Sequence, residues 1–329
     1  MTNFKKYFAY HLGSSLKTLV YILVAVLILT FILASNGQPS SNGIFRSTIY
    51  IPIHFLCIMM YVLPVSEFSF FKKRTNLDCA YSLPISRRAM GIVHYLTGMI
   101  SLFTVYTASY LVTFIMALSR GPGLFNFAAM AGHYLFCLIL GIAVYTLMAF
   151  LFNEGNTKGD GIWFMVLYTF VFMLIDSALI FFIDKINVLG DFGAIPWLSI
   201  PLITEYFTKL VEGKSIAQYE AASIELYFKW AIFWIAIGIA SGIGLFLTFG
   251  KRRMEKTEEI SNSFFGYRVL IPLYAVTGMI TFEVWNGNVI LWVIIELFAL
   301  LGYTIYRRGF HYKKSDIAIL LLLFIFLFI

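Results

Sequence analysis

Charged side chains are scarce in this chain, and their scarcity limits where the protein can reside. Only 12% of its 329 residues are charged and 60% are hydrophobic, which leaves too little polar surface to cover a water-soluble protein of this size. Cysteines are also few. Cys57, Cys79 and Cys137 have no paired spacing, so they indicate neither a disulfide framework nor a zinc site. The composition therefore predicts a protein whose solvent is lipid.

The chain also lacks the phosphate loop G-x-x-x-x-G-K-[ST]. Its nearest glycine-containing loop, residues 153–161, has lysine and glycine in the reverse order, so the chain cannot hydrolyse ATP by that route. The pair Glu258 and Glu259 resembles the paired glutamates of membrane-embedded proteases, but the arginine expected four positions further is Ser263. We therefore predict no catalytic residue, no metal site and no cofactor held by this chain itself.

Long apolar runs, by contrast, are abundant. A helix that crosses the hydrocarbon core needs about 20 mostly apolar residues. The runs are apolar on every face, which is not the alternation of a transmembrane β-barrel, so we expect an all-α polytopic bundle of eight or nine spans. The expected spans are 16–34, 47–65, 91–118, 128–152, 161–183, 227–249, 268–285 and 288–306, with a weaker run at 317–329.

Lysine and arginine are unevenly divided between the expected loops. If the N-terminus is cytoplasmic, 18 of them lie on the cytoplasmic side and 6 lie outside. Such a bias is the positive-inside signal, and it sets the orientation. The net charge of +7 therefore indicates topology rather than a nucleic-acid partner.

The spacing of Phe4, Phe8 and Leu12 predicts a short helix at 1–15 that lies in the membrane interface. A cleaved signal peptide is the alternative, but residues 32–34 make a poor small-x-small cleavage site. We expect the run that follows to stay as the first span.

The expected spans divide into two groups. Residues 16–250 form a six-span core with a cytoplasmic loop at 67–90 and an extracellular connection at 184–226. A cytoplasmic link, 251–267, leads to a C-terminal group of two or three spans at 268–329. On the sixth span, the small residues Gly238, Ser241, Gly242 and Gly244 predict a face for close helix packing.

The loop at 67–90 is the most informative stretch. Residues 77–82 can form a helical turn or two, Pro84 would break it, and Arg87 and Arg88 anchor the start of the next span. A short, partly apolar helix at the cytoplasmic surface is a plausible docking site for a partner. An ordinary interfacial loop is the alternative.

The motif Leu83-Pro84-Ile85-Ser86-Arg87, preceded by basic residues and Asp78, resembles the permease subunits of type-2 ABC exporters. The tail, with Arg252 to Lys256 after the sixth span and Tyr306 to Lys314 near the end, is similar to the longer permeases of bacterial multi-gene exporters linked to cell-wall-active peptides. In that family the loop between the second and third spans is a coupling helix that sits in a cleft of a separate ATPase. The docking residues that the resemblance implies are Leu77, Asp78, Leu83, Pro84, Ile85, Ser86 and Arg87.

The resemblance also implies a function. The chain would be the non-enzymatic membrane subunit of an ATP-driven exporter in a bacterial cell membrane, and it would move an amphipathic peptide or lipid-like substrate. ATP and magnesium would be bound by the partner ATPase. A second permease chain, identical or paralogous, would complete the path.

Isolated polar residues within the spans leave alternatives open. Asp176 and Glu296 could carry protons in a secondary transporter, or could be hydrogen-bonded structural acids. A non-transporting scaffold or sensor is a further alternative. His54, His94 and His133 lie on three different spans without the spacing of a metal site, so we expect them to be lone polar residues at helix contacts.

Overall fold

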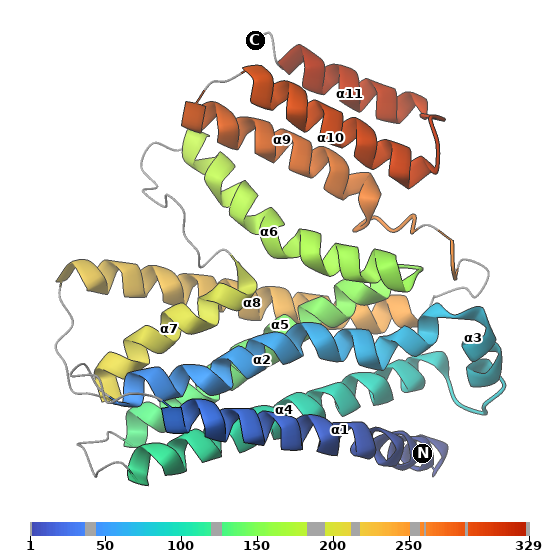
Figure 1. Ribbon diagram of the computed structural model, residues 1–329. Helices are drawn as coiled ribbons and strands as arrows, with labels where there is room; N and C mark the ends of the chain where they lie inside the picture. Colours follow the sequence, from blue (N-terminus) through green and yellow to red (C-terminus); the bar gives the residue numbers. More distant parts are fainter. Residues whose placement is uncertain are drawn as a thin grey trace. The chain divides into compact units, whose positions relative to one another are not determined.

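The computed structural model describes residues 2–36, 44–119, 127–182, 195–211, 218–250, 257–259, 261–286 and 289–326. These residues are almost entirely helical and contain no β-strand (Figure 1). The helices are α1 (Thr2–Asn36), α2 (Ile44–Phe68), the 3-10 helix η1 (Ser69–Lys72), α3 (Arg74–Tyr81), α4 (Arg87–Ser119), α5 (Phe127–Glu154), α6 (Lys158–Phe182), α7 (Pro196–Val211), α8 (Gln218–Phe249), α9 (Tyr267–Asn286), α10 (Val289–Arg307) and α11 (Lys314–Phe326).

Within the described residues, six helices are long and apolar enough to cross a membrane: α1, α2, α4, α5, α6 and α8. The all-helical membrane fold expected from the sequence is confirmed at this level. The expected total of eight or nine spans is not shown, because only these six helices qualify among the described residues. The expected interfacial helix at 1–15 is continuous with the first span in α1, which has no break at residue 15.

The chain divides into two compact units. Unit 1 comprises Met1–Asn153 and Pro196–Glu255, and unit 2 comprises Glu154–Ile195 and Lys256–Ile329. This division differs from the expected six-span core, because α6 belongs to unit 2. The reason lies in local contacts: α6 packs along α9, and the Tyr267 hydroxyl donates to Oδ1 of Asp160 at 2.9 Å.

In unit 1, α4 packs along both α1 and α2, and α7 packs against α2 and α8 (Figure 1). Helix α5 is the most deeply buried of the six long helices, and most of its side chains from Met130 to Asn153 are inaccessible. Large apolar side chains such as Leu111, Ile115 and Ile239 are exposed on the outer helices. A core helix surrounded by outward-facing apolar residues is the arrangement expected in lipid.

The helix pair α5 and α8 approaches closely through the predicted glycine face. A Cβ atom added at Gly238 would lie 2.7 Å from the Cα atom of Ala143, and one at Gly242 would lie 3.3 Å from Thr146. Contact with backbone atoms cannot be relieved by turning a side chain. The sequence prediction of a small-residue packing face is confirmed.

We predict that Gly238→Ala destabilises the protein by about 1–3 kcal/mol, because it overpacks the contact between α5 and α8. Gly13→Ala on α1 is the matched control, since nothing lies within 4 Å of the added Cβ atom there. Thermal unfolding of both variants in the same detergent checks this. Equal unfolding temperatures for the two variants would contradict the close approach.

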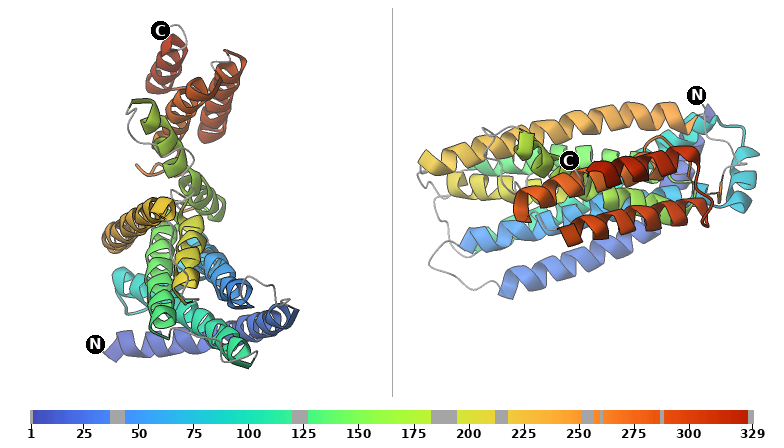
Figure 2. Two further views of the ribbon diagram at one scale, coloured as in Figure 1. Left: turned by 90° about the vertical axis from the view of Figure 1, so that its left-hand side faces the viewer. Right: turned by 90° about the horizontal axis from the view of Figure 1, so that it is seen from above.

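In unit 2, α9 packs against α6 and α10, and α10 packs against α11 (Figure 1 and Figure 2). Ala275, Met279, Trp292 and Ala299 form a small buried cluster on α9 and α10. The turn between α10 and α11 is held by Arg307, whose Nε and Nη2 atoms donate to the Asp316 carboxylate at 2.8 and 3.0 Å. This bidentate pair fixes the direction in which α11 returns.

Candidate functional site

The predicted docking loop begins where α2 ends. η1 leads directly into α3, and the turn at residues 82–86 then leads into α4. Figure 1 shows α3 at the end of unit 1 where α1 begins, beyond the ends of α2 and α4. Helix α3 spans Arg74–Tyr81, so it begins three residues before the helix predicted at 77–82.

The turn before α4 is fixed by local hydrogen bonds. The Ser86 hydroxyl accepts from the backbone N–H of Ala89 at 3.2 Å, which makes Ser86 the N-cap of α4. The backbone N–H of Ile85 donates to the Leu83 carbonyl at 2.7 Å. On the other side, the Asn3 side-chain amide donates to the Pro84 carbonyl at 3.3 Å, so the turn is also tied to α1.

The predicted docking residues do not all face outward. Asp78, Pro84, Ser86 and Arg87 are exposed, Leu83 is 39% exposed and Ile85 is half-buried. Leu77, in contrast, is fully buried, so its side chain anchors α3 and cannot itself contact a partner. The expectation for Leu77 is therefore corrected.

Two buried charged side chains lie at the end of α2, just before α3. The first is Lys72 in η1, whose Nζ atom donates to the carbonyls of Phe152 and Asn153 at 2.7 and 3.2 Å. These are among the last carbonyls of α5, which lack partners within the helix. Lys72, one of the 18 basic residues counted on the expected cytoplasmic side, is buried and caps the C-terminus of the core helix.

We predict that Lys72→Met lowers the free energy of unfolding by about 1.5–3 kcal/mol, because it removes charged donors from two buried carbonyls. Lys73→Met is the matched control, since Lys73 is the next residue and its side chain is exposed. Thermal unfolding in detergent compares them. If Lys73→Met were as destabilising as Lys72→Met, the capping role would be wrong.

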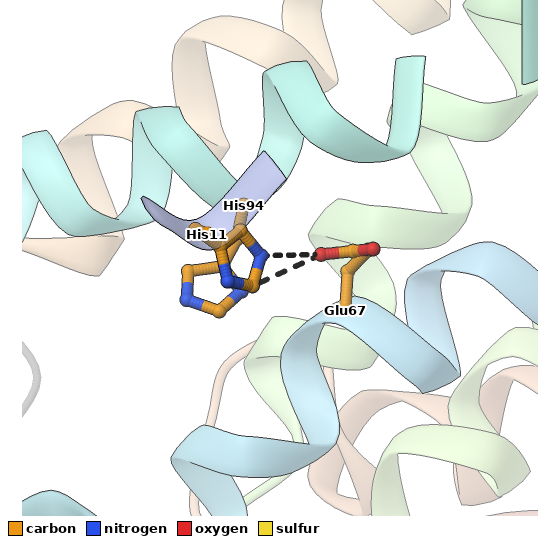
Figure 3. Close-up of side chains that lie close together, drawn as sticks. All are labelled: His11, Glu67 and His94. Atoms are coloured by element: carbon orange, nitrogen blue, oxygen red, sulfur yellow. Dashed lines mark hydrogen bonds and ion pairs between the residues drawn. The ribbon is translucent and has the colours of Figure 1, made fainter. Parts of the chain in front are cut away.

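The second buried charge is Glu67, which meets two histidines from other helices. Its Oε2 atom lies 2.9 Å from Nε2 of His11 on α1 and 3.5 Å from Nδ1 of His94 on α4. Figure 3 shows both imidazole rings turned toward the same end of the carboxylate. The ring centroids of the two histidines are 3.9 Å apart. We call these three residues the His/Glu cluster.

Aromatic side chains enclose the His/Glu cluster. Nε2 of His94 lies 3.2 Å from the Tyr7 hydroxyl. The ring of Phe71 meets the His94 ring edge-on at a centroid distance of 4.7 Å. His94 and Glu67 are buried and His11 is half-buried, so one side of the cluster remains accessible.

That accessible side opens into a groove of about 830 Å³. His11, Glu67 and His94 line it together with Leu83, Pro84 and Ile85 from the docking turn. The cluster and the turn therefore share one groove at the same end of unit 1.

The other two histidines of the expected spans differ in their surroundings. The imidazole of His133 is buried between Tyr110 on α4 and Thr204 on α7, with contacts of 3.2 Å to each hydroxyl. His54 is exposed and contacts the Tyr50 carbonyl of its own helix at 2.6 Å. The expected polar residue at a helix contact is therefore confirmed for His133, whereas His54 contacts its own helix.

For His94 the expectation was wrong, because it is not a lone polar residue. A signal for the cluster was present: His11, Glu67 and His94 each lie within a few residues of the cytoplasmic end of an expected span. The sequence therefore placed them at one depth. It did not show that their helices are neighbours.

The two carboxylates considered for proton transfer lie in unit 2. Asp176 is on α6, and its side chain lies outside the described residues. Glu296 is on α10 and half-buried. The described residues bring no ionisable partner to Glu296.

Comparison of the chain with models of known families, with curated proteins and with solved structures finds no match. No relative therefore indicates a function, and the function has to be inferred from the residues of this chain.

Proposed function

We propose that this chain is the membrane subunit of an ATP-driven exporter and that a separate cytoplasmic ATPase docks on α3 and the turn at residues 82–86. The observation that carries the proposal is the position of α3, a short helix outside the spans, held at the common end of α2 and α4. An energy-supplying partner needs such an element, because it must reach the spans without entering the membrane.

The exposed surface has the composition of a docking site. Leu83 and Pro84 offer exposed apolar surface, and Asp78 and Arg87 are exposed and carry opposite charges. Interfaces commonly combine a small apolar centre with a polar rim. The distribution of lysine and arginine supports a cytoplasmic position for this surface, where ATP is available.

The contacts behind α3 supply a route for mechanical coupling. A displacement of α3 acts on the end of α2, where Lys72 contacts the end of α5 and Glu67 contacts α1 and α4. Rigid helices joined by buried polar contacts can pass a shift from one end of a bundle to the other. ATP-driven closure of the partner would in this way rearrange the spans.

The remaining parts of the proposal follow from the exporter class. ATP and magnesium are bound by the partner, because this sequence has no phosphate loop. A second permease chain completes the path across the cell membrane. The substrate is an amphipathic peptide or lipid-like molecule.

We predict that Leu83→Asp reduces co-purification of the ATPase at least about tenfold in mild detergent, because it removes an apolar contact of about 1.4 kcal/mol or more. Phe310→Asp is the matched control: Phe310 is 79% exposed and lies in the turn between α10 and α11, away from α3 in the chain. The captured protein must be identified as an ATPase by its phosphate loop.

Two results would contradict the proposal. One is retention of the ATPase by Leu83→Asp at the level of the unmodified chain. The other is the absence of any ATPase from the unmodified chain in several mild detergents.

A further inference from the structure

The His/Glu cluster places three metal-ligating atoms in one small space, each from a different helix. One ligand atom from each of His11, Glu67 and His94 lies within 4.8 Å of the other two. In a tetrahedral zinc site with bonds of about 2.0–2.1 Å, neighbouring ligand atoms are about 3.3 Å apart. The observed separations from Oε2, 2.9 and 3.5 Å, lie on either side of that value. An ion could enter with small side-chain movements.

Without an ion, the hydrogen bonds of the cluster are incomplete. His11 contacts Oε2 of Glu67 at 2.9 Å. Nδ1 of His94 is buried, faces the same oxygen at 3.5 Å and has no hydrogen-bond partner among the described residues. A buried polar atom without a partner costs about 1–3 kcal/mol. A cation bound to all three atoms would remove that cost.

The surroundings of His94 also suit a metal ligand. A histidine that binds a metal through one nitrogen usually donates a hydrogen bond from the other. If Nδ1 of His94 binds the ion, Nε2 carries the proton and lies 3.2 Å from the Tyr7 hydroxyl, which can accept it. Tyr7 would then fix the tautomer and the orientation of the ring.

From these observations we propose that His11, Glu67 and His94 form a binding site for one divalent transition-metal ion. Two imidazoles and one carboxylate favour Zn²⁺ over Ca²⁺ or Mg²⁺, which prefer oxygen ligands only. The groove of about 830 Å³ beside the cluster leaves the fourth position open to water or to a bound molecule. The ion would join α1, α2 and α4 beside the docking turn. This site does not depend on the exporter proposal.

The test uses the full-length chain, purified in mild detergent without a histidine tag and stripped with EDTA. Titration with Co²⁺ is followed by visible absorption, and Zn²⁺ is then added in competition. We expect the d–d bands of cobalt bound by nitrogen and oxygen ligands, displacement by one Zn²⁺ per chain, and a higher unfolding temperature in the presence of Zn²⁺.

Two ligand variants and one control locate the site. Glu67→Gln and His94→Ala should each weaken Zn²⁺ binding by at least about tenfold. His54→Ala should bind as the unmodified chain does, because His54 is an exposed histidine on α2 that contacts only its own helix among the interactions described. Size-exclusion elution checks that each variant is folded.

If a variant does not fold, the Co²⁺ and Zn²⁺ titrations of the unmodified chain still test the proposal. Failure to bind Co²⁺ or Zn²⁺ at micromolar free metal would overturn the proposal. Thiolate-to-cobalt charge-transfer bands would also overturn it, because they would assign the ligands to one or more of the cysteines at 57, 79 and 137. Binding by both ligand variants equal to that of the unmodified chain would do the same.

Discussion

The buried charges at the end of α2 constrain the rest of unit 1. A charge away from water is tolerated only where opposite charges or hydrogen-bonding groups surround it. Glu67 meets this requirement with histidines from α1 and α4, and Lys72 meets it with the terminal carbonyls of α5. Within six residues the chain is thus joined to three other helices. Moving α5 away would leave the buried Lys72 without these carbonyls, and moving α1 away would leave Glu67 without its 2.9 Å contact to His11.

This constraint explains why α3 has a defined position although it lies outside the spans. It follows Lys72 directly, its buried Leu77 anchors it, and Asn3 holds the turn after it. A partner bound to α3 would therefore act on a fixed element rather than on a loose loop. The same end of α2 carries the His/Glu cluster. An ion bound there would strengthen the contacts between α1, α2 and α4, through which a docked ATPase is proposed to act. Docking and metal binding would then be linked energetically.

The elements that the sequence predicts well are those determined by local composition. Apolar runs locate the six long helices, Pro84 and Arg87 mark the start of α4, and Gly238 marks a close helix contact. Features that depend on which helices are neighbours could not be predicted in this way. His11 and His94 meet at Glu67 only because α1 and α2 both pack on α4, and no apolar run encodes that choice. The sequence around Lys72 does not show that its ammonium group contacts the carbonyls at the end of α5. The assignment of α6 to unit 2 likewise depends on its contact with α9.

The central claim is that α3 and its following turn receive an ATPase. Site-specific photo-cross-linking tests it most directly, with a photoreactive phenylalanine analogue in place of Leu83 in the intact cell and, for comparison, in place of the exposed Phe103 on α4. The account predicts a cross-link from position 83 to a cytoplasmic protein that mass spectrometry identifies as a phosphate-loop ATPase, and no such product from position 103. If position 83 gives only lipid adducts, or cross-links only to proteins without a phosphate loop, the account is contradicted.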